Sequence, residues 1–97
     1  MKHVILLAAA LAAPVAQAQD AASRNLAAPC AICHGTGGKP ATRDVTPLAG
    51  LAREQIVTQM RAFRDGQRPA TVMHQIAKGY NDAQIDAIAG WYAAQKR

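Results

Sequence analysis

Cys30-Ala31-Ile32-Cys33-His34 is the stretch that decides the fold of this chain. A C-x-x-C-H pattern is typical of c-type haem attachment. Two thiols three residues apart on one helical turn can each add to a vinyl group on one edge of a haem. The neighbouring His34 is then held under the iron and supplies an imidazole nitrogen. The motif therefore predicts one haem, bound covalently through Cys30 and Cys33, with His34 as an axial iron ligand.

Two other interpretations of the same cysteines remain open. A thioredoxin-like redox pair needs a βαβ framework, which neither the length nor the periodicity of the chain favours. A zinc site could combine Cys30, Cys33, His34 and His74, which are ligands of a suitable type. Structural zinc sites usually bring two separated pairs of ligands, however, and Cys33 and His34 are immediate neighbours. The haem interpretation is favoured over both.

The sixth iron ligand has three candidates. Met60 shares an apolar stripe with Ile56 and Phe63, and a methionine there is typical of core packing. Met73 lies 39 residues after His34, beyond a turn, so the chain has room to pass one haem edge and return on the other face. A thioether there raises the reduction potential and closes the iron to outside ligands. Met73 is the favoured ligand, with His74 and an open position as alternatives.

The rest of the chain indicates an all-α fold of short helices joined by long loops. Helical spacing of apolar residues, a capping-box pair at Asn81 and Gln84, and glycines at helix ends mark the elements. Pro29 should end or kink the first helix near Ala28. Helices are expected at 20–28, 52–65, 72–78 and 81–95, with a long loop at 35–50.

The N-terminus resembles an export signal. Lys2 precedes an apolar run of ten residues, Val4 to Ala13, and Ala16-Gln17-Ala18 has the small-x-small pattern of a cleavage site. Ten apolar residues are too few to span a bilayer, so no stable membrane insertion is expected. The prediction is a signal peptide at 1–18, cleaved after Ala18, a monohaem domain at 19–97, and a location in the periplasm.

Charge and composition exclude one class of partner. The chain carries a formal charge of +5, but its basic residues are scattered and it has only four aromatic residues. Nucleic-acid binding is therefore not expected. The scattered charges fit a solvated surface, with steering toward an acidic partner as the alternative.

A ligating histidine generally donates its other ring N–H to a carbonyl or carboxylate. The Thr46-Pro47-Leu48-Ala49-Gly50 stretch offers a candidate, because a proline fixes its own backbone angle and can aim its carbonyl well. Pro47 is therefore one candidate acceptor for His34. An ordinary turn proline is the alternative.

These residues together resemble a class I cytochrome c of the short, cytochrome c4-like kind. The similarity covers essentially residues 19–97. Besides the attachment motif it is carried by Pro47 to Gly50, Ala62 to Arg68, Met73, Ile76 to Tyr80, and the closing stretch Asn81 to Gln95 with its Trp91-Tyr92 pair. In the family's Pro-x-Leu-Ala-Gly-like segment the proline carbonyl receives the histidine N–H, which again points to Pro47. The resemblance implies three to five short helices wrapped around the haem.

The resemblance also implies a function. It indicates a one-electron carrier with His34 and Met73 on the iron, rather than an enzyme. The amino-acid sequence of Thr71 to Met73 and Ile76 to Tyr80 is most similar to that of the cytochrome subunit of flavocytochrome c sulfide dehydrogenase. That similarity implies a flavoprotein partner that oxidises sulfide and passes electrons to this haem. The alternative is a haem enzyme or a gas- or peroxide-binding protein with a labile sixth ligand.

Overall fold

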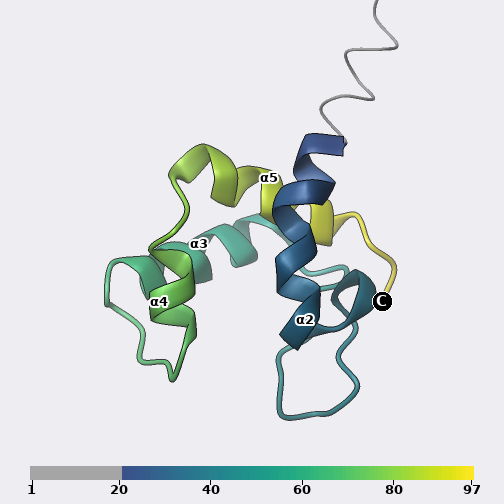
Figure 1. The fold of residues 1–97 in the computed structure, drawn as a ribbon, viewed down its shortest axis with the longest axis horizontal. Helices are drawn as coiled ribbons and strands as arrows, with labels where there is room; N and C mark the ends of the chain where they lie inside the picture. Colours follow the sequence, from purple (N-terminus) through teal and green to yellow (C-terminus); the bar gives the residue numbers. More distant parts are fainter. Residues whose placement is uncertain (1–20) are drawn as a thin grey trace, which may run out of the picture.

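The computed structural model describes residues 21–97 (Figure 1), and every regular element in that range is helical. Residues 21–27 form the first described helix. After it come the 3₁₀ turn η1 (Ala28–Cys30), α2 (Ala31–His34), the 3₁₀ turn η2 (Thr36–Gly38), α3 (Arg53–Arg64), α4 (Met73–Ala77) and α5 (Asp82–Ala93). The predicted fold class, a small all-α cytochrome-like fold of three to five short helices, is confirmed. The predicted signal peptide, 1–18, lies outside the described residues.

The core forms where α5 packs against α3 and against the first helix. α5 contributes Ile85, Ile88 and Tyr92, all at most 2% exposed. α3 contributes Ile56 and Met60, which lie on one face because they are one helical turn apart. The apolar stripe predicted around Met60 is therefore confirmed as part of the buried surface, and α5 presents a second one opposite it.

The start of α5 is fixed by local sequence. The Asn81 side chain accepts a hydrogen bond of 2.8 Å from the Gln84 N–H, and the Gln84 side chain accepts one of 2.9 Å from the Asn81 N–H. This is the predicted capping box, in which each residue satisfies the other's free amide. Asp82, the first residue of α5, also accepts a hydrogen bond of 2.8 Å from Arg64 at the end of α3. The two helices are thus tied at one end by side chains as well as by the core.

The first described helix changes character at the predicted proline. Pro29 lies inside η1, and the Ala31 N–H donates to the Ala28 carbonyl as in a 3₁₀ turn. A proline has no N–H to continue the α-helical pattern. The prediction of an end or kink near Ala28 is confirmed, and the chain resumes an α-helical turn at α2. No helix within residues 21–97 combines the length and apolar character needed to cross a membrane.

Candidate functional site

α2 is a single helical turn that carries the attachment motif. Cys30, just before it, is half-buried, whereas Cys33 is exposed, and both thiols are free. Gly35 ends the turn at φ +85°, a conformation that favours glycine. A Cβ at Gly35 would lie 2.0 Å from the Lys39 carbonyl oxygen, so no other residue fits. The chain therefore turns sharply after His34 and leaves the two thiols and the imidazole on one short turn.

His34 is held by a single well-placed hydrogen bond. Its Nδ1 donates to the carbonyl oxygen of Thr46, 2.7 Å away and 12 residues along the chain. Because Nδ1 carries the proton in this bond, Nε2 keeps its lone pair and can bind a metal. This is the arrangement that an axial histidine needs.

The prediction that the Pro47 carbonyl receives the His34 N–H is wrong by one residue, since the acceptor is Thr46. The cause lies in the register of the motif. Pro-x-Leu-Ala-Gly places its proline two residues before the leucine, and two residues before Leu48 stands Thr46. Pro47 still contributes, because a proline biases the residue before it toward an extended backbone.

The three candidates for the second ligand lie in different surroundings. Met60 is only 7% exposed and belongs to the core cluster, as its stripe predicted. Met73 is the first residue of α4 and packs against that cluster while remaining partly exposed. α4 and α2 lie on opposite sides of the fold in Figure 1. His74 is partly buried, and its Nδ1 is buried without a hydrogen-bond partner in the described part of the chain.

The alternative chemistries for the cysteines find no support in the geometry. Among residues 21–97 no three side chains of the histidine, cysteine and carboxylate type come close enough to hold a metal ion together. The proposed zinc set of Cys30, Cys33, His34 and His74 is therefore not assembled. No strand occurs in the same range, so the βαβ framework of a thioredoxin-like pair is also missing there.

Tyr92 is a residue that the sequence did not single out for the site. Its hydroxyl donates a buried hydrogen bond of 2.6 Å to the Ala27 carbonyl and lies beside the Cys30 thiol. Burial, with a smaller effect of Cys30, raises the pKa of Tyr92 to about 12. Burial likewise raises the pKa of the Cys30 thiol. Both groups therefore stay protonated at neutral pH, and the phenol remains a donor.

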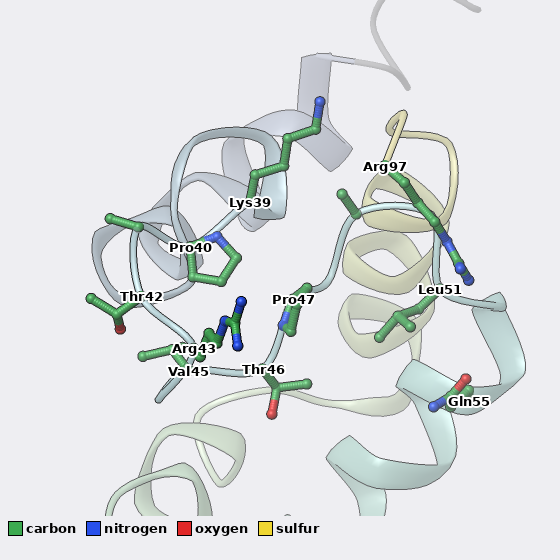
Figure 2. A pocket seen from close by; sticks show the side chains of 12 residues that line it. Lys39, Pro40, Thr42, Arg43, Val45, Thr46, Pro47, Leu51, Gln55 and Arg97 are labelled. Atoms are coloured by element: carbon green, nitrogen blue, oxygen red, sulfur yellow. The ribbon is translucent and has the colours of Figure 1, made fainter.

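A hollow of about 790 Å³ lies beside the attachment turn rather than at it. The loop from Lys39 to Pro47 forms one wall, and Leu51 and Gln55 lie across from it, as Figure 2 shows. Pro47 is the single predicted site residue among those that line this hollow. The wall of this hollow therefore includes Thr46, whose carbonyl accepts the hydrogen bond from His34.

Several apolar residues between α2 and α4 in the sequence remain partly exposed. Leu48, Leu51, Val57 and Phe63 pack against the core cluster but remain partly exposed, as Met73 does. On α4, Ile76 is 40% exposed, and Val72 just before it is 51% exposed. Two thiols and a free imidazole nitrogen on one turn are the protein groups that a covalently attached haem needs, and exposed apolar side chains give such a group a surface to pack against.

Comparison with known proteins agrees with this chemistry. No protein-family model matches the chain. The chain is 33% identical over 79 residues to cytochrome c-554(548) of Halomonas halodenitrificans, covering 78% of this chain and 95% of that protein. The chain belongs to the c-type cytochromes. The predicted resemblance to class I, cytochrome c4-like proteins is confirmed.

Two further relatives of this cytochrome are named for their role in sulfur oxidation. The chain is 40% identical over 82 residues, 84% of its length, to a thiosulfate dehydrogenase electron acceptor of Thiomonas intermedia. It is 38% identical over 63 residues, 65% of the chain, to the cytochrome subunit of sulfide dehydrogenase of Chlorobaculum tepidum. The chain spans 38% and 56% of the length of these two relatives. As a member of the c-type cytochromes, the chain is an electron-transfer protein rather than an enzyme and carries haem c.

Proposed function

We propose that this cytochrome is a periplasmic one-electron carrier whose haem is attached through Cys30 and Cys33, with His34 and Met73 as axial ligands. The observation that carries the proposal is the bond from His34 Nδ1 to the Thr46 carbonyl, because it fixes the tautomer that leaves Nε2 for iron. A haem held by these residues would supply one-electron redox chemistry. The residues of the chain hold it, close it to other ligands and set its potential.

The two sides of the site have distinct tasks. On the proximal side, the carbonyl of Thr46 strengthens the His34 imidazole as an electron donor, because it accepts the N–H of that ring. On the distal side, Met73 supplies a thioether, which favours the ferrous state and raises the potential. With both positions filled, the protein exchanges electrons without binding a substrate at the metal. Exposed Cys33 places the attached edge near solvent, where a partner can approach.

Methionine ligation is tested with a matched pair of variants. Met73→Leu and Met60→Leu remove the same sulfur and nearly conserve side-chain volume. Ferric haem with a methionine ligand shows a weak near-infrared absorption band. We expect Met73→Leu to abolish this band and Met60→Leu to retain it. The opposite pattern, or a band that survives Met73→Leu, would overturn the ligand assignment.

The alternative of a gas- or peroxide-binding haem is tested on the ferrous protein with carbon monoxide. A closed His34/Met73 site predicts slow, incomplete binding at neutral pH, and Met73→Leu should make binding fast. Rapid and full binding by the unmodified protein would refute the simple carrier.

The proposed electron donor is an enzyme that oxidises a reduced sulfur compound, and a sulfide-oxidising flavoprotein is the first to test. Support comes from the names of the two relatives, one an acceptor for thiosulfate dehydrogenase and the other a subunit of sulfide dehydrogenase. The assay follows reduction of the ferric haem in the presence of flavoprotein and sulfide. Sulfide alone is the control, because it reduces haem slowly without an enzyme. A second arm uses thiosulfate dehydrogenase with thiosulfate. No acceleration over the control in either arm would overturn the assignment of the donor.

A further inference from the structure

Tyr92 joins the C-terminal helix to the turn that carries the haem cysteines. Its side chain is 1% exposed, and its hydroxyl donates 2.6 Å to the Ala27 carbonyl, 65 residues earlier in the chain. Tyr92 thus holds the backbone three residues before Cys30. A buried hydrogen bond of this kind is costly to lose, because the acceptor is left without its partner and away from water.

The Ala27 carbonyl is available to Tyr92 because of Pro29. In a continuous α-helix the Ala31 N–H would donate to Ala27, but here it donates to Ala28. Pro29 favours this change, because its ring crowds the backbone of Ala28 and the chain tightens into a 3₁₀ turn around it. The hydroxyl of Tyr92 supplies the donor that a regular helix would have supplied.

Tyr92 also holds the segment that ends at the acceptor for His34. Its backbone carbonyl accepts the Gly50 N–H at 3.0 Å. Its ring lies so close to Gly38 that a Cβ there would be 2.9 Å from the ring atom Cδ1. Gly38 in turn accepts hydrogen bonds from the amides of Leu48 and Ala49, at 2.9 and 3.1 Å. These contacts fix the chain directly after Thr46.

We propose that Tyr92 is a positioning residue for the proximal haem ligand. It holds the attachment turn through Ala27 and the Thr46–Gly50 segment through Gly38 and Gly50, and so sets the distance between the His34 imidazole and the Thr46 carbonyl. The proposal rests on the proposed function in one respect, that His34 is an axial ligand. Tyr92 forms no hydrogen bond to His34 or Thr46 and acts through the segments it holds.

The test compares Tyr92→Phe with Tyr80→Phe in the haem-loaded protein. Both changes remove one phenol oxygen, but the Tyr80 hydroxyl makes no hydrogen bond within residues 21–97, and its ring is only half-buried against the core. Tyr92→Phe should raise the equilibrium constant for unfolding about tenfold, the effect of losing one buried hydrogen bond. Tyr92→Phe should also move the hyperfine-shifted NMR signals of His34 and of the haem methyl groups. The reduction potential should rise, because a looser bond to Thr46 leaves the imidazole a weaker donor. Tyr80→Phe should leave all three within error.

Pro29→Ala provides the second arm of the test. Alanine removes the restriction that proline places on Ala28 and lets the Ala31 amide return to Ala27 in an α-helical turn, so the Tyr92 hydroxyl is no longer the main donor to that carbonyl. In the Pro29→Ala background, Tyr92→Phe should raise the unfolding constant by less than about threefold, a departure from additivity that a double-mutant cycle measures.

The outcomes separate the two claims. If Tyr92→Phe destabilises the protein but leaves the NMR signals and the potential unchanged, Tyr92 is structural only and the positioning role is refuted. If Tyr92→Phe and Tyr80→Phe behave alike, or if the loss is equally large in the Pro29→Ala background, the proposal also fails. Failure of the proposed function would appear instead in the unmodified protein, as an absence of histidine-ligand signals from the ferric haem.

Discussion

Gly38 is the residue whose substitution tests the proximal architecture most sharply. It is buried in the loop after His34 and has φ +81°, in the left-handed region. A Cβ at this position would lie 2.7 Å from the Ala49 nitrogen and 2.9 Å from the Tyr92 ring. The Ala49 nitrogen is a backbone atom, and its N–H already donates a hydrogen bond to the Gly38 carbonyl. It therefore cannot move aside without disturbing the segment beyond Thr46.

The magnitude follows from two terms. Any non-glycine residue at this φ loses about 1–2 kcal/mol to left-handed strain. Forcing a methyl group into a packed site costs about 1–3 kcal/mol more. Gly38→Ala should therefore lower the free energy of unfolding by about 2–5 kcal/mol. Gly37→Ala is the matched control, because Gly37 has φ +63° but a Cβ there would meet nothing within 4 Å. Gly37→Ala should lower the free energy of unfolding only by the cost of the left-handed backbone strain.

The assay is denaturant unfolding of the haem-loaded variants, followed by helical circular dichroism and by haem absorbance. With an unchanged m-value, the difference in midpoint reports the difference in stability. Changing glycine to alanine also restricts the unfolded chain. This effect is the same in both variants and cancels when they are compared. A gap of about 1–3 kcal/mol between Gly38→Ala and Gly37→Ala is expected. Equal losses would refute the close packing of Gly38 against Ala49 and Tyr92.

Three further predictions follow. Pro47→Ala should lower the free energy of unfolding by about 0.4–1 kcal/mol, because it frees the unfolded chain, and should leave the His34 NMR signals in place; displaced signals would show that the ring of Pro47, and not the backbone hydrogen bonds at Gly38 and Gly50, holds the Thr46 carbonyl. Arg64, together with Arg61, holds the pKa of the Asp82 carboxyl below its usual value. These exposed ion pairs therefore stabilise the fold above pH 3.8, and their contribution is lost as the pH falls further. The melting temperature of Asp82→Asn should vary less with pH in acid than that of the unmodified protein, and identical pH profiles would count against the pairs. Burial raises the pKa of Tyr92 to about 12 from 10.0. The stabilising effect of the protonated phenol is therefore complete below pH 10.0 and is lost as the pH approaches 12. The free energy of unfolding should depend less on pH across this range in Tyr92→Phe, and an unaltered dependence would show that Tyr92 is not the titrating group.

Features that are local in sequence could be predicted from it. The capping box at Asn81 and Gln84 and the stripe from Ile85 to Tyr92 depend on residues three or four apart, and the structure has both. The kink at Pro29 is equally local, because it follows from a missing N–H. The turn that carries Cys30, Cys33 and His34 was identifiable from five consecutive letters, since haem attachment demands that spacing.

Features that join distant segments could not be predicted in the same way. The proline in Thr46-Pro47 drew attention to the wrong carbonyl, although counting back from Leu48 would have pointed to Thr46. The role of Tyr92 had no such signal. Its acceptor, Ala27, is 65 residues away and is an alanine, whose backbone oxygen leaves no mark in a sequence. A buried tyrosine in a C-terminal stripe therefore appears as core, and its hydroxyl is identified only in three dimensions.

The two sides of the proposed haem site differ in how firmly the chain holds them. On the proximal side, His34 belongs to the turn that bears both cysteines, and Thr46, Gly38 and Tyr92 restrain the segments around it through hydrogen bonds. On the distal side, Met73 begins a helix of five residues that has no side-chain cap. The one fully buried residue of that helix is Ala77, which offers little apolar area. Segments with few buried contacts open most easily. If the sixth position of this cytochrome ever becomes available to another ligand, the movement should begin in α4 while the His34 side stays in place. Whether the protein remains a pure electron carrier therefore depends on how well α4 packs against α3, and not on the motif that binds the haem.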